Sequence, residues 1–99
     1  MRLTQSQRTM ICDASAEIFG AGAGIWLFGS RADDSQRGGD IDILVDIPEP
    51  VNNPALLAAR LSAKVARMMQ GRKIDVLLSA PNLLRLPIHD VAFREGCQL

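Results

Sequence analysis

Residues 25–46 of the 99-residue chain read Ile25-Trp26-Leu27-Phe28-Gly29-Ser30-Arg31-Ala32-Asp33-Asp34-Ser35-Gln36-Arg37-Gly38-Gly39-Asp40-Ile41-Asp42-Ile43-Leu44-Val45-Asp46. One apolar run stops at a Gly-Ser pair, and a second apolar run carries carboxylates at alternate positions. Because strand side chains alternate between faces, Asp40 and Asp42 point the same way, about 6.6 Å apart along the strand. The residues between and after them point the other way, into a core. The stretch predicts a strand with one buried face and two acids at its N-terminal end.

Two acids in an apolar strand are costly unless a positive group lies between them. Hard oxygen ligands select Mg²⁺ or Mn²⁺, so a divalent metal is the expected partner. A third acid, Asp75, stands alone in the later apolar run Ile74-Asp75-Val76-Leu77-Leu78. If that run forms a strand beside the first, three carboxylates converge. This is the ligand set of a two-metal phosphoryl-transfer site.

The rest of the chain alternates helical and strand patterns, which favours an α/β-type unit with a small sheet. Thr4 and Gln7 have the spacing of a capping box, and Gly20 offers a left-handed helix end. Asn53 and Pro54 are a suitable cap and first helical residue. The expected elements are a helix over 4–20, a strand over 25–28, a short helix over 31–34, a strand over 40–47, a helix over 53–71, a strand over 74–78, and a helical region that begins at 81–82, restarts at Pro87 and ends near Glu95.

Size and composition favour one domain over residues 1–99, with hydrophobic residues at 47% of the chain. A formal net charge of zero and few aromatic residues argue against a nucleic-acid or membrane-surface partner. No apolar run approaches the roughly 20 residues that span a membrane. Cys12 and Cys97 lack a metal-like spacing, and no signal peptide is evident, so we expect reduced thiols and a cytoplasmic location.

Four single residues have a structural and a functional interpretation. Trp26 is expected in the core, with base stacking as the alternative. Asp46, at the end of its strand, is expected to be a turn residue rather than a ligand, and His89, the single histidine, is expected at a solvated helix position. Ser30 either caps the short helix or binds an anion, and the two roles are compatible.

A Gly-Ser turn, an Asp-x-Asp strand and a lone Asp in a later strand, in this order, resemble the DNA-polymerase-β-like nucleotidyltransferase superfamily. Phe28-Gly29-Ser30-Arg31-Ala32 and Asp40-Ile41-Asp42-Ile43-Leu44-Val45 look like its minimal nucleotidyltransferase (MNT) branch. The resemblance covers nearly the whole chain. It implies an α+β fold with a small mixed sheet, helices on one face and the carboxylates on the other.

The resemblance also implies roles for individual residues. Asp40 and Asp42 would hold two Mg²⁺ ions, and Asp75 would complete the site of the ion that activates the acceptor and take the acceptor's proton. Ser30 and the Gly29 backbone would bind the triphosphate of ATP or another NTP, with Arg31 as a further phosphate contact.

MNT proteins resemble the antitoxins of two-gene modules, in which the partner is a HEPN-type toxin. The resemblance therefore implies transfer of AMP, or another NMP, to a hydroxyl of a partner protein, and assembly with that partner. Two alternatives stay open: an antitoxin that neutralises by contact without catalysis, and a transferase acting on a small molecule or an RNA end.

Overall fold

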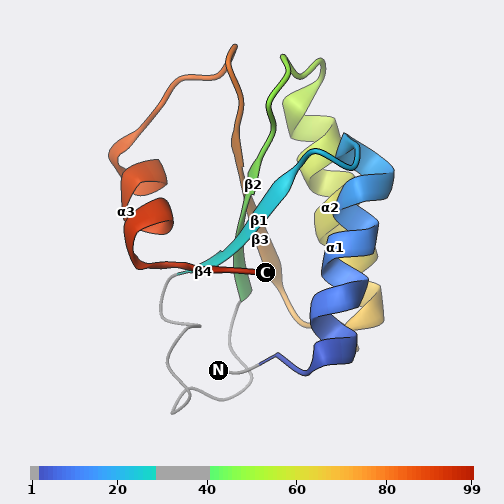
Figure 1. Cartoon of the computed structure of the whole chain (residues 1–99). Helices are drawn as coiled ribbons and strands as arrows, with labels where there is room; N and C mark the ends of the chain where they lie inside the picture. Colours follow the sequence, from blue (N-terminus) through green and yellow to red (C-terminus); the bar gives the residue numbers. More distant parts are fainter. Residues whose placement is uncertain (1–2, 29–40) are drawn as a thin grey trace.

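The computed structural model describes residues 3–28 and 41–99. In chain order, its elements are α1 (Gln5–Phe19), β1 (Gly24–Phe28), β2 (Ile41–Asp46), α2 (Pro54–Met68), β3 (Ile74–Ser79), α3 (Pro87–Glu95) and β4 (Cys97–Gln98). The strands form one sheet in the order β3-β2-β1-β4 (Figure 1). β2 and β3 run parallel, whereas β1 is antiparallel to both of its neighbours. This confirms the predicted fold class, a small mixed sheet with helices.

The ends of α1 follow the sequence signals. The Gln7 N–H donates to the Thr4 hydroxyl at 3.0 Å, and the Thr4 N–H donates to the Gln7 side chain at 2.9 Å. The predicted capping box is therefore present, and Gly20 ends the helix with a positive φ of 100°. At α2 the boundary is as predicted but the cap is not. Asn53 has a left-handed backbone, φ 56°, and its side chain makes no capping bond.

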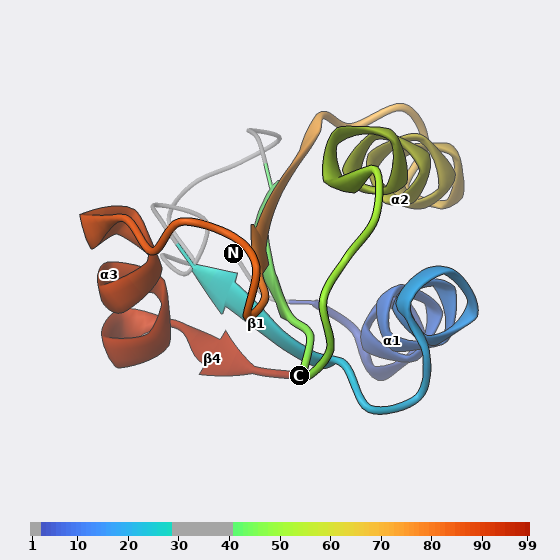
Figure 2. The same ribbon diagram turned by 90° about the horizontal axis from the view of Figure 1, so that it is seen from above.

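One face of the sheet is buried under α1 and α2 (Figure 2). The odd-numbered residues of β2 lie on this face and are fully buried, as the alternation predicts. Together with residues of β1, β3 and both helices they form one core cluster, which includes Ile11, Ile25, Leu27, Ile41, Ile43, Val45, Leu61, Val65 and Ile74. Most of the hydrophobic stabilisation of this small protein therefore comes from this face.

The opposite face carries α3, which Figure 2 places on the other side of the sheet from α1 and α2. Phe28 and Leu44 of the sheet pack there with Ala92 of α3. Trp26 meets Phe93 edge-on, with ring centroids 4.9 Å apart. Trp26 is partly buried and packs against this smaller cluster, in agreement with its expected packing role. The expectation that the helices lie on one face and the carboxylates on the other is wrong, because α3 lies on the face that carries Asp42.

The segment before α3 differs from the prediction. Residues 81–83 form a turn, and the helix begins only at Pro87. Asn82 is used differently: its carboxamide donates to the Val51 carbonyl and accepts from the Val51 N–H, both at 2.9 Å. A side chain committed to these tertiary bonds cannot cap a helix. β4 was not predicted, because two residues carry no periodic pattern, yet it pairs with Trp26 and Leu27 of β1.

None of the helices in the described ranges is long and apolar enough to cross a membrane.

Candidate active site

Three side chains form a row across neighbouring strands. Phe28 on β1 is the register partner of Asp42 on β2, and Asp42 is the register partner of Asp75 on β3. Register partners in adjacent strands project from the same face, and adjacent strands lie about 4.8 Å apart. The two predicted carboxylates therefore lie side by side, although 33 positions separate them in the sequence. The parallel pairing of β2 and β3 is what brings them together.

The row lies at a pocket of about 420 Å³. Asp42 is half-buried and Asp75 is exposed, so a ligand can reach both. The remaining lining is apolar and comes from β1, β3 and α3: Phe28, Val76, Leu77, Ile88 and Val91. Charges beside apolar walls interact more strongly than in water, because the local dielectric constant is lower. The pocket combines two acids with apolar side chains from three elements.

The other predicted site residues lie outside the described ranges. Asp40 immediately precedes β2, and Gly29, Ser30 and Arg31 follow β1. Their roles stay predictions, as does the short helix over 31–34. Within residues 3–28 and 41–99, no three His, Cys, Asp or Glu side chains come together as a metal cluster. The prediction that Asp40 is the third carboxylate therefore stays a prediction.

The two described carboxylates fit a divalent cation. They are hard oxygen donors, the type that Mg²⁺ and Mn²⁺ prefer, and they come from neighbouring strands that carry them on one face. Asp42 makes an interaction within the protein, which is compatible with its also binding a metal. Asp75 is the more exposed residue of the pair.

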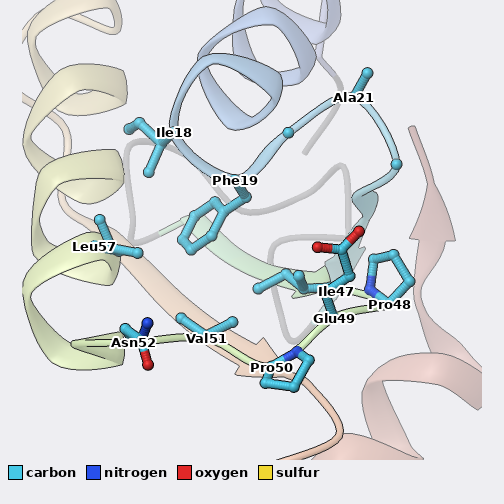
Figure 3. A pocket seen from close by; sticks show the side chains of 12 residues that line it. Ile18, Phe19, Ala21, Ile47, Pro48, Glu49, Pro50, Val51, Asn52 and Leu57 are labelled. Atoms are coloured by element: carbon cyan, nitrogen blue, oxygen red, sulfur yellow. The ribbon is translucent and has the colours of Figure 1, made fainter.

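A second pocket lies at the other end of the strands (Figure 3). It has a volume of about 370 Å³ and is formed by the segments after α1 and after β2, with Phe19, Ile47 and Leu57 among its walls. Glu49 is its single acid. One carboxylate among apolar side chains does not offer the donor set of a metal site, so this pocket is not the candidate for chemistry.

Asp46 is the last residue of β2, four positions from Asp42, where Ser79 is its register partner. It lines a separate pocket with Arg85 and His89. Along a strand, four positions correspond to about 13 Å, so Asp46 is too far away to join the Asp42–Asp75 pair. This position agrees with the expectation that Asp46 is not a ligand of the pair. Asp46 is nevertheless a strand residue and not the expected turn residue.

His89 contradicts its prediction. Only 3% of the residue is exposed, whereas a solvated position was expected. Its Nδ1 accepts from the Leu86 N–H at 3.0 Å, and its Nε2 lies 2.8 Å from the Leu78 carbonyl oxygen. The sequence does contain a signal for this: His89 is the third residue of a helix that starts at Pro87, the position from which a side chain reaches back to the capping residue.

Comparison with known proteins identifies the family of the chain. Residues 10–95 match the family model described as a nucleotidyltransferase domain. The chain therefore belongs to the nucleotidyltransferase domain family, and this confirms the resemblance seen in the sequence. No significant match to a curated protein was found.

Solved structures share the fold at low identity. A crystal structure of a toxin–antitoxin with AMP-PNP has a TM-score of 0.69 and 23% identity, over 97% of this chain and 72% of that chain. The toxin–antitoxin MntA-HepT has a TM-score of 0.66 and 22% identity, over 96% and 70% of the respective chains. A protein from Shewanella oneidensis has a TM-score of 0.64 and 18% identity, over 98% and 71%.

Proposed function

We propose that this chain is the antitoxin of a HEPN/MNT-type pair and transfers AMP from ATP to a hydroxyl of its partner protein in the cytoplasm. The observation that carries the proposal is the register pairing of Asp42 with Asp75 at an open pocket. It is supported by the family of the chain and by the shared fold with toxin–antitoxin proteins, one of them determined with AMP-PNP.

Each predicted residue has a role in the proposed reaction. Asp40, Asp42 and Asp75 would hold two Mg²⁺ ions, which stabilise the charge on the attacking and leaving oxygens when bound. The Gly29 backbone, Ser30 and Arg31 would bind the triphosphate. Asp75, exposed at the pocket, would take the proton of the acceptor hydroxyl.

The bonds that change are those of a phosphoryl transfer. The acceptor oxygen forms a bond to the α-phosphorus of ATP, the bond from that phosphorus to the bridging oxygen breaks, and pyrophosphate leaves. The apolar walls, Ile88 and Val91 among them, limit the water that could compete with the acceptor.

Label transfer from nucleotides tests the proposal. The protein is incubated with Mg²⁺, its host lysate and α-labelled ATP, GTP, CTP or UTP, and labelled proteins are identified. Asp42→Asn and Asp75→Asn should each lower the labelling rate by about a hundredfold or more, because each removes a charge that acts in the transition state. Asp46→Asn is the matched control, since it makes the same change on the same strand away from the pair, and it should leave the rate unchanged.

A binding assay separates catalysis from contact. Nucleotide with Mg²⁺ at about 100 times its Kd should stabilise the folded protein by about 2.7 kcal/mol, and Asp42→Asn should abolish the gain. Absence of label with every nucleotide, together with an unchanged melting temperature, would refute the proposal and favour an antitoxin that acts by contact. If an RNA end or a small molecule is labelled instead of a protein, the acceptor is that RNA end or small molecule.

A further inference from the structure

His89 is a buried titratable side chain outside the carboxylate pocket, and both of its ring nitrogens are occupied. The Leu86 amide can only donate, so Nδ1 must accept the bond at 3.0 Å. Nε2 then carries the proton and donates to the Leu78 carbonyl at 2.8 Å. The geometry defines a neutral imidazole with its proton on Nε2. It joins the start of α3 to the end of β3.

The carbonyl that His89 occupies belongs to the strand that carries Asp75. β3 is an outer strand of the sheet, and β2 uses the carbonyls of odd-numbered β3 residues, Lys73 and Ser79 at its two ends. Leu78, at an even position, therefore directs its carbonyl away from β2. His89 satisfies that carbonyl from α3, so the helix is attached to β3 three residues beyond Asp75.

This attachment determines which face of α3 meets the carboxylates. Ile88 and Val91 are three residues apart and so share a helix face, which lines the pocket of Asp42 and Asp75. The far end of α3 is held separately by Phe93, whose ring packs against Trp26. Without the bridge from His89, the start of this nine-residue helix would keep its apolar contacts and the exposed ion pair between Asp90 and Arg85, and Arg85 lies in the segment before the helix rather than on the sheet.

We propose that His89 is a positioning residue for the carboxylate site: its imidazole bridge to Leu86 and Leu78 holds Ile88 and Val91 as the water-limiting wall beside Asp42 and Asp75. In this role, His89 contacts neither the pocket of the two carboxylates nor the acceptor. The proposal rests on the proposed function for its effect on activity, but the placement of α3 can be tested without nucleotide.

Trp26 is the only tryptophan of the chain, and it packs on α3 through Phe93. Its emission therefore reports how α3 is docked. His89→Ala should shift the emission to longer wavelength and increase acrylamide quenching, with far-UV circular dichroism largely retained. His89→Gln should stay close to the wild type, because a carboxamide also offers one acceptor and one donor.

Activity completes the test. Well below the melting temperature, His89→Ala should lower kcat for label transfer from α-labelled ATP by about tenfold or more, the scale on which residues that orient a site act. His89→Gln should recover most of it. The proposal would be overturned by wild-type emission and kcat in His89→Ala, or by an equal loss in both variants. If the wild type transfers no label, the proposed function fails, and the emission of Trp26 still decides the role of His89.

Discussion

Among the glycines that the structure describes, Gly96 is the one where an added methyl group would meet the closest backbone atoms. It lies between α3 and β4, and its N–H donates to the Ala92 carbonyl at 2.9 Å. A Cβ built there would lie 2.9 Å from the Leu27 carbonyl oxygen, 3.2 Å from the Phe28 Cβ, and closer still to the Ala92 carbonyl oxygen. Two of these three atoms are backbone atoms, which cannot rotate away.

The size of the effect follows from packing, since the backbone is not in a glycine-only region: φ is −80°. Forcing a methyl group into a filled space costs about 1–3 kcal/mol, and two backbone contacts place Gly96→Ala at the upper end. Alanine also restricts the unfolded chain more than glycine does, and this effect alone would stabilise the folded protein by about 0.4–1 kcal/mol. The net loss is about 2 kcal/mol, which lowers the melting temperature of a chain of this size by about 10 °C.

The assay is thermal unfolding followed by circular dichroism, with urea unfolding to check that the m-value stays constant. Gly22→Ala is the matched control, because a Cβ there meets only the Pro48 Cγ at an ordinary 3.5 Å. It should change the free energy of unfolding by no more than about 0.5 kcal/mol. A melting temperature of Gly96→Ala within about 2 °C of the wild type, or an equal fall in both variants, would refute the packing argument.

Three further predictions concern single contacts. Asn82→Ala should lower the free energy of unfolding by about 1–3 kcal/mol, because both polar backbone groups of Val51 lose their partner; an unchanged urea midpoint would contradict this. Thr4→Ala should lower it by about 1 kcal/mol through loss of the α1 capping box, and Thr4→Ser should restore most of it. Burial raises the pKa of Cys12, so at pH 8 iodoacetamide should modify Cys12 more slowly than exposed Cys97, and equal rates by mass spectrometry would argue against this.

Local signals account for the parts of the fold that the sequence predicted. The capping box of α1, the Asn-Pro start of α2 and the alternation of β2 act within one turn or one strand, and each boundary lies within a few residues of its prediction. The pairing of Asp42 with Asp75 was conditional on two strands being neighbours. Periodicity places both acids on strands, but only the tertiary fold makes the strands adjacent.

The misses have a common physical cause: they are residues whose partners are distant in the sequence. His89 was expected in solvent because it is the single histidine and no partner stands at a regular spacing from it, yet it is buried and its ring bonds to the Leu78 carbonyl at the sheet edge. The helical region predicted from residues 81–82 does not form there, and the Asn82 carboxamide bonds to the backbone of Val51 instead. β4 exists only through its pairing with β1.

The two faces of β2 link stability to the site. Ile41, Ile43 and Val45 are fully buried on one face, and a shift of the strand by one residue would remove them from the main core and place Asp42 there instead. The cost of that exchange fixes the register, and the register places Asp42 beside Asp75. The carboxylate pair is therefore positioned by apolar side chains on the opposite face of the sheet. Substitutions in that core that loosen the register should weaken the site before the protein unfolds, even though they touch neither acid.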